Sequence, residues 1–79
     1  MTRERNVAAI EVKSVVTGSV WKIVASVGQS LAPGDEIMIL ESMKMEIPVI
    51  VEDGGVLKEL KVAEGVTVNE GQVLAVIEE

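Results

Sequence analysis

The chain carries an internal repeat. The stretch "GSVWKIVASVGQSLAPGDEIMILE", which starts at Gly18, aligns without a gap with "GVLKELKVAEGVTVNEGQVLAVIE", which starts at Gly55. The offset is 55 minus 18, or 37 residues, in a chain of 79. Such a repeat predicts two similar halves, although turn glycines and β-branched residues also recur by chance in β-rich chains. The aligned residues are Gly18, Val20, Gly28, Leu31, Gly34, Ile37, Ile39, Leu40 and Glu41 with Gly55, Leu57, Gly65, Val68, Gly71, Leu74, Val76, Ile77 and Glu78.

The same offset extends towards the start of the chain. It pairs Ile10 with Ile47 and Val12 with Val49, so the halves run from about 10 to 41 and from about 47 to 78. Residues 42–46 are then the joint between the halves. If a pseudo-twofold axis relates the halves, this joint lies at one end of the molecule and both chain ends lie at the other.

The residue pattern within each half favours β-strands over helices. Valine and isoleucine are abundant, and glycines recur at short intervals. The apolar positions shift phase once in each half, after Val20 and after Leu57, which predicts a β-bulge at equivalent places. "VGQSLAPGD" and "EGVTVNEGQ" each predict two turns around a very short strand. We therefore expect an all-β fold of about eight short strands in two packed sheets, closed as a flattened barrel.

The repeat also predicts core positions. Val76 is aligned with Ile39 in an apolar run, and we expect it to be buried. The change Val76→Asp is therefore predicted to unfold the domain, because it would bury an unpaired charge.

The joint "ESMKME" allows two local structures. Glutamate, methionine and lysine form helices well, so a helical turn starting at Ser42 is one possibility. Pro48 disfavours helix at Ile47, however, and too few residues remain for a stable helix. With "EIMIL" before the joint and "IPVIV" after it, a tight hairpin with Lys44 at its tip is the better prediction.

Length and composition exclude several classes of function. A chain of 79 residues allows one domain, residues 1–79, with the first several residues as a flexible or edge segment. Histidine and cysteine are both absent, which argues against a catalytic centre, a thiolate metal site and a disulfide framework. A net charge of −6 and a single aromatic residue, Trp21, argue against nucleic-acid binding. No apolar run is long enough to span a bilayer, and "MTRERN" does not resemble a signal peptide, so we expect a cytoplasmic protein.

The sequence around Lys44 resembles a known motif. "ESMKMEIPV" is similar to the attachment motif of biotinyl domains, in which a lysine between two methionines receives biotin through an amide bond. The repeated "VGQSLAPGDEIMILE" pattern resembles the same family, in particular its small free-standing carriers, the biotin/lipoyl attachment proteins and small biotin carboxyl carrier proteins. The resemblance implies a barrel-sandwich hybrid of two four-stranded antiparallel sheets with pseudo-twofold symmetry and Lys44 on a β-hairpin tip.

The resemblance also implies roles for the residues beside Lys44. Met43 and Met45 match the motif and would be recognised by the ligase or would orient the lysine. Ser42 stands where many biotinyl domains have alanine. Glu41 and Glu46 also match common motif positions, but they could equally be solubilising charges beside a hairpin.

The implied function is that of a biotin carboxyl carrier without catalytic residues of its own. A biotin protein ligase would attach biotin to Lys44, which removes one positive charge and changes the net charge from −6 to −7. The carrier would then take a carboxyl group from a biotin carboxylase to a carboxyltransferase, as in acetyl-CoA carboxylase, at a high effective concentration. The acceptor substrate is a property of the carboxyltransferase and is not predicted by this sequence.

Two other interpretations remain open. Lipoyl domains share the fold, but they usually have aspartate before the lysine and a small apolar residue after it, where this chain has Met43 and Met45. Modification by lipoate, alone or in addition to biotin, is therefore the first alternative. The second is an unmodified β-barrel scaffold in which Lys44 is an ordinary surface residue. No inserted segment corresponding to the protruding thumb of some bacterial carriers is present.

Overall fold

The computed structural model describes residues 9–79, which form eight β-strands. The predicted flexible or edge segment at the start of the chain lies outside the described residues. Within the described range, no helix suited to crossing a membrane was found. The strands are β1 (Ala9–Lys13), β2 (Gly18–Ile23), β3 (Ser30–Leu31), β4 (Glu36–Ser42), β5 (Met45–Ile50), β6 (Gly55–Leu60), β7 (Thr67–Val68) and β8 (Val73–Glu78).

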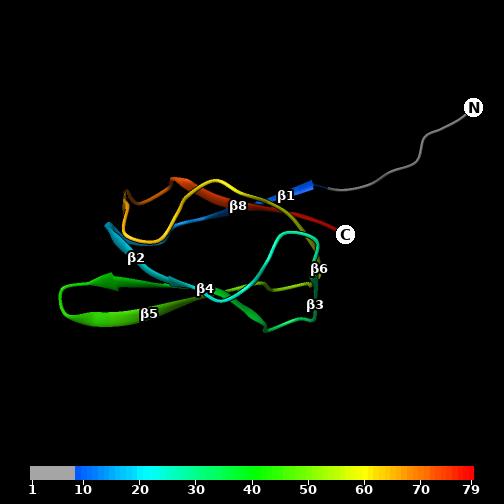
Figure 1. Ribbon diagram of the computed structural model, residues 1–79, viewed down its shortest axis with the longest axis horizontal. Helices are drawn as coiled ribbons and strands as arrows, with labels where there is room; N and C mark the ends of the chain where they lie inside the picture. The colour runs from blue at the N-terminus through cyan, green and yellow to red at the C-terminus, as the bar shows by residue number, and fades with distance from the viewer. Residues whose placement is uncertain (1–8) are drawn as a thin grey trace, which may run out of the picture.

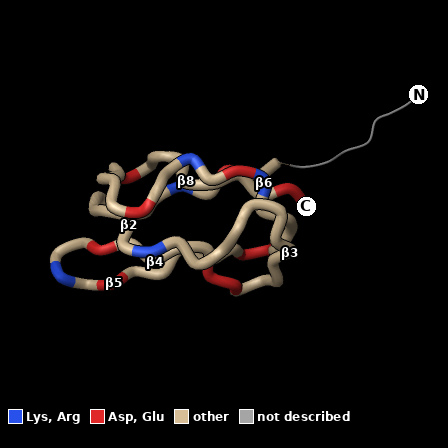
Figure 2. Tube along the Cα trace, in the orientation of Figure 1, with Lys and Arg blue, Asp and Glu red and all other residues tan. Residues whose placement is uncertain are grey.

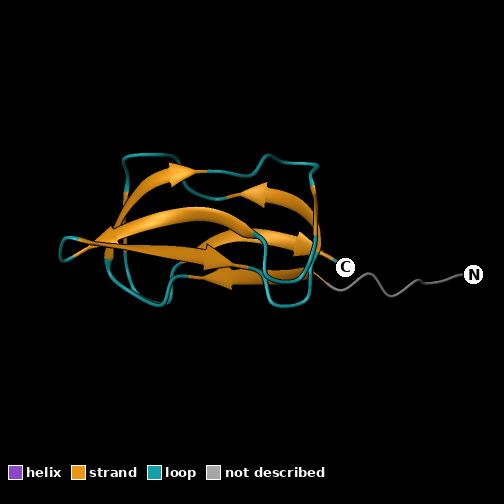
Figure 3. Cartoon of the chain, turned by 90° about the horizontal axis from the view of Figure 1, so that it is seen from below, coloured by secondary structure: helices purple, strands orange, loops and turns teal. Residues whose placement is uncertain are grey.

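The strands form two four-stranded antiparallel sheets. One sheet has the order β1-β8-β6-β3 and the other has the order β5-β4-β2-β7. The sheets face one another as two layers (Figures 1 and 3). The 37-residue offset makes β1 equivalent to β5, β2 to β6, β3 to β7 and β4 to β8. Replacing each strand by its equivalent converts the order of one sheet into the order of the other. The predicted all-β fold, with pseudo-twofold symmetry, is therefore confirmed, and so are the two very short strands, β3 and β7.

Backbone hydrogen bonds between the halves repeat with the same offset. The Gly28 amide donates to the Leu57 carbonyl at 2.7 Å, and the Gly65 amide donates to the Val20 carbonyl, also at 2.7 Å. Each residue of the first bond lies 37 positions from its counterpart in the second. The repeat in the sequence is thus a structural duplication, in which each half satisfies backbone groups of the other.

The two predicted bulges occur at equivalent places. Pairing of β2 with β4 shifts between Val20 and Lys22, and pairing of β6 with β8 shifts between Leu57 and Glu59. At each bulge two successive residues are exposed before the strand turns back to the core. The core between the sheets consists of Val20, Ala25, Leu31, Ile37, Met38, Leu40, Val51, Leu57, Val68, Leu74, Ala75 and Ile77.

The prediction that Val76 belongs to this core is wrong. Val76 is only half-buried, whereas Leu74, Ala75 and Ile77 are buried. The reason is a register shift where β8 pairs with β1, opposite the Val12/Lys13 step. The shift places two successive residues of β8 inside and turns Val76 outwards, so simple alternation along the strand gives the wrong face.

The symmetry axis places the joint and the chain ends apart. The β4–β5 hairpin protrudes at one end of the molecule, while the start of β1 and the C-terminus lie towards the other (Figure 1). The joint is a hairpin and not a helical turn, as the sequence predicts.

Candidate functional site

The β4–β5 hairpin closes with a two-residue turn. Ser42 pairs with Met45, and the two residues between them, Met43 and Lys44, have φ angles of 53° and 66°. Positive φ at both central residues is the pattern of a type I′ turn, which usually contains asparagine, aspartate or glycine. This left-handed conformation costs about 1–2 kcal/mol for each residue that has a Cβ atom. The pairing of two long strands holds the chain in a turn that its own sequence disfavours, as is frequent at functional sites.

All three side chains at the tip are exposed. Met43 is 90% exposed and Met45 is 62% exposed, and Lys44 is also exposed. Among residues 9–79, no ion pair or hydrogen bond of the Lys44 amine is present. Neither methionine packs beneath the turn. Figure 2 shows a basic segment at the outer end of the hairpin and acidic segments in its two strands.

The base of the hairpin is fixed by Ser42. Its hydroxyl donates a hydrogen bond of 2.8 Å to the carbonyl of Thr17, which precedes β2. Gly18 follows immediately, and a Cβ atom at that position would overlap the carbonyl oxygen of Glu41. Glycine is required there because the β2 backbone passes so close to β4. The last paired residues of the hairpin are thus anchored to the body of the domain, and the lysine projects from a rigid support.

The two glutamates of the motif lie opposite one another. Glu41 in β4 pairs with Glu46 in β5, and both are exposed. Like charges on directly opposite residues of antiparallel strands destabilise the pair. The hairpin therefore carries a negative collar below the lysine that does not contribute to its stability. All six predicted site residues, from Glu41 to Glu46, are together at this tip.

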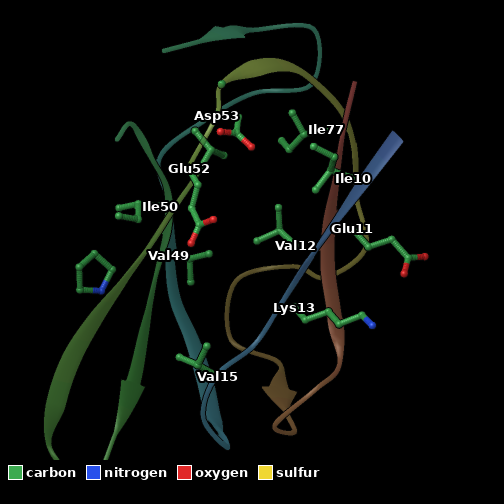
Figure 4. Close-up of a pocket in the computed structure, with 13 residues that line it drawn as sticks. Ile10, Glu11, Val12, Lys13, Val15, Val49, Ile50, Glu52, Asp53 and Ile77 are labelled. Carbon is green, nitrogen blue, oxygen red and sulfur yellow. The ribbon is translucent and has the colours of Figure 1, made fainter. Parts of the chain in front are cut away.

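A separate apolar groove lies between the edge strands β1 and β5. It has a volume of about 410 Å³. Val12 and Val49 point into it from opposite sides (Figure 4), and Pro48 and Ile50 of β5 also line it. Lys44 does not line this groove. Within the described residues, no cluster of three or more potential metal ligands is present.

Comparison with known proteins identifies the family. The family model described as "Biotin-requiring enzyme", which covers biotin and lipoyl domains, matches residues 7–77. The chain belongs to this family. The biotin/lipoyl domain is 48% identical over 59 residues to the biotin/lipoyl attachment protein of Bacillus subtilis (strain 168), which covers 75% of this chain and 81% of that protein. It is 38% identical over 69 residues to the biotinylated protein TB7.3 homolog of Mycobacterium leprae (strain TN), and this alignment covers 87% of this chain and 97% of that protein.

The fold of this biotin/lipoyl domain also occurs within a much larger enzyme. The crystal structure of urea carboxylase from Kluyveromyces lactis matches with a TM-score of 0.85 and 34% sequence identity. The match covers 98% of this chain and 7% of the urea carboxylase chain. The domain is therefore similar to one small part of that enzyme.

Proposed function

We propose that the protein is a biotin carboxyl carrier and that Lys44 is the residue to which biotin is attached. The observation that carries this proposal is the strained, anchored turn that holds the Lys44 amine at an exposed tip. A free amine at the end of a protruding hairpin can enter the active site of another protein, while an amine within a flat sheet cannot. The family model and the biotinylated relative support the same assignment.

The attachment chemistry requires little from the carrier itself. The Lys44 ammonium loses a proton, its nitrogen attacks the carbonyl carbon of an activated biotinyl group, and an amide forms as the activating group leaves. The chain contains no histidine, so we assign the base to a biotin protein ligase. Lys44 Nζ, free of ion pairs within the described residues, fits this role. When bound, biotin would hold the carboxyl group that is transferred.

The carrier role follows from the position of the arm. A lysine at a rigid tip can visit a biotin carboxylase and then a carboxyltransferase, and tethering gives a high effective concentration at both. We assign the chemistry to these partners and none of it to the carrier. An acyl-CoA carboxylase such as acetyl-CoA carboxylase is a suitable context, and a urea carboxylase is another, because a relative of the whole domain lies within one.

Lipoate is the second candidate group. The name of the Bacillus relative includes both biotin and lipoate, and either group forms an amide with a lysine amine. We favour biotin because methionine stands on both sides of Lys44, as in biotinyl domains.

Intact mass is the test of this function. The wild-type protein, incubated with biotin protein ligase, ATP and biotin, is expected to gain a single biotinyl increment, and peptide mapping should place it on Lys44. Lys44→Arg should gain none, because a guanidinium is too weak a nucleophile, yet it should melt within about 1 °C of wild type because the side chain is exposed.

A parallel reaction with lipoate ligase and lipoate separates the alternatives. An unmodified mass with biotin but an increment with lipoate would assign a lipoyl carrier. An unmodified mass in both reactions would leave the scaffold interpretation. Labelling of Lys44→Arg would show that another lysine is the acceptor.

A further inference from the structure

The outer faces of the two sheets carry different residue types at positions that the duplication makes equivalent. On the sheet that carries the hairpin, one row across β2, β4 and β5 consists of Lys22, Ile39 and Pro48. Trp21 lies beside this row as the extra residue of the bulge, and Ile50 follows two residues after Pro48 on the same face of β5. Together Trp21, Ile39, Pro48 and Ile50 form an apolar surface, named here the Trp21 face, and the exposed Lys22 and Glu36 lie beside it.

The Trp21 face is open to solvent. Trp21 is 51% exposed and Ile50 is 49% exposed, Pro48 is exposed and Ile39 is half-buried. None of the four belongs to the core or packs against it. Trp21 is the single aromatic residue of the chain, and exposing half of a tryptophan gives up stabilisation that burial would provide.

Three of the four equivalent positions on the other sheet are charged. At an offset of 37 residues, Trp21 corresponds to Lys58, Ile50 to Lys13 and Pro48 to Glu11, whereas Ile39 corresponds to the apolar Val76. Lys58 forms an exposed ion pair of 3.7 Å with Glu78. Since the two sheets have equivalent strand orders, the fold does not require apolar residues at the positions of Trp21, Pro48 and Ile50. The difference between the faces therefore has a cause outside the stability of the domain.

The Trp21 face is continuous with the hairpin. Strands β4 and β5 carry Ile39, Pro48 and Ile50, and they extend without interruption to Ser42 and Met45 on either side of the turn. A protein that receives the Lys44 tip therefore lies next to this face. The acidic collar of Glu41 and Glu46 lies between the two and would suit a partner with basic residues at that point.

Among the proposed partners, the ligase depends most on a protein surface beside the hairpin to recognise the carrier. Lys13, Lys22, Lys58 and Lys61 are exposed like Lys44, so an exposed amine alone does not identify the acceptor. A standard specific interface buries about 800 Å² and about 20–30 residues on each partner, many more than the two residues of the turn. Enzymes that act later recognise the attached group as well, whereas the ligase meets only protein. Exposed tryptophan is typical of the residues that dominate binding energy at interfaces.

Resting on the proposed function, we propose that the Trp21 face is the docking surface for the biotin protein ligase, through an apolar patch on the ligase bordered by basic residues. Binding there aligns the hairpin so that the Lys44 amine reaches the activated biotin. Trp21 is thus a specificity-determining residue and not a reacting one.

Steady-state biotinylation with purified cognate ligase tests this proposal. Trp21→Lys, which introduces the residue found at the equivalent position, is expected to raise KM for the carrier about ten-fold or more and to leave kcat within about two-fold. Ile50→Lys is expected to act in the same direction. The matched control is Lys58→Ala, which alters the equivalent position on the other face and should leave KM within about two-fold. Circular dichroism and the melting temperature identify any variant that fails to fold.

A binding measurement gives an independent result. Calorimetric titration of Lys44→Arg into the ligase should give a Kd that rises about ten-fold when Trp21→Lys is added. If wild-type carrier is labelled and Trp21→Lys has the same KM and Kd, the docking surface is wrong and the carrier function stands. If wild-type carrier is not labelled, the carrier function itself fails. Sedimentation showing a dimer that Trp21→Lys dissociates would assign the face to a second copy and overturn the proposal.

Discussion

At the scale of single residues, the tip combines an exposed lysine with an unfavourable backbone. Met43 and Lys44 both adopt positive φ, a conformation that glycine or asparagine would adopt more easily. The nearby Met45 is also exposed, at 62% against 90% for Met43, but it lies in a strand. The strain therefore belongs to two residues that present the amine, and substitution can measure it at Met43 without altering the lysine.

The change Met43→Gly is expected to raise the free energy of unfolding by about 0.5–1 kcal/mol. Removing the Cβ atom relieves about 1–2 kcal/mol of left-handed strain, and the greater freedom of glycine in the unfolded chain offsets part of this gain. Urea unfolding followed by circular dichroism measures the change. Met45→Gly is the matched control and should lower stability by about 0.5–1 kcal/mol. Equal losses in both variants would contradict the assignment of strain to the turn.

At the scale of elements, each half contains one place where two of its own strands pass very close together. A Cβ atom on Gly18 would overlap the carbonyl oxygen of Glu41, and a Cβ atom on Gly55 would lie 2.5 Å from the carbonyl oxygen of Glu78. At these equivalent positions the lack of a side chain allows β2 to pair closely with β4 and β6 with β8. The close approach at Gly18 lies next to the turn of the hairpin, because Glu41 directly precedes Ser42 at the end of β4.

Substitution of Gly18 should therefore affect the whole hairpin. Gly18→Ala is expected to lower the free energy of unfolding by about 3 kcal/mol, since the methyl group meets backbone that cannot rotate away. Gly28→Ala is the control, because a Cβ atom there has open space and only the φ angle of 93° is unfavourable. It should cost about 1 kcal/mol. Denaturant titration compares the two, and a Gly18→Ala protein as stable as Gly28→Ala would show that the strands separate easily.

At the scale of the whole molecule, much of the architecture could be predicted because it is duplicated. Glycine and apolar positions repeated at one offset determined the two halves, the bulges and the position of the Lys44 hairpin. The burial of single positions could not be predicted as well. Val76 faces outwards because a register shift between β1 and β8 interrupts the alternation, and no residue type marks that shift in the sequence.

The site was predicted less completely than the fold. The residues around Lys44 stand out by their order, but the positive φ of Met43 and the Ser42 bond to Thr17 depend on strands brought together in space. The Trp21 face also went unnoticed, although comparing the two halves for unlike residues at equivalent positions would have indicated it. Lys58 at the position of Trp21 was the available signal.

The corrected core leads to a prediction for β8. Ile77→Asp is expected to lower the free energy of unfolding by more than about 4 kcal/mol, because Ile77 is 2% exposed and the charge would be unpaired. Val76→Asp should cost only about 1 kcal/mol, mainly through repulsion from the adjacent Glu11 and Glu59, and remain folded. Far-ultraviolet circular dichroism at 25 °C distinguishes a folded from an unfolded protein. An unfolded Val76→Asp protein would show that this side of β8 is covered.

The opposite placement of the hairpin and the C-terminus makes the domain a two-ended adaptor (Figure 1). Under the proposed function, one end is available for a peptide connection and the other for the attached group, and neither obstructs the other. A fluorescent protein, a solid support or a neighbouring enzyme could therefore be fused after Glu79 while the lysine still faces outwards. The same geometry is compatible with the occurrence of a similar domain within a much larger enzyme, because connections at the end away from the hairpin would leave the hairpin exposed.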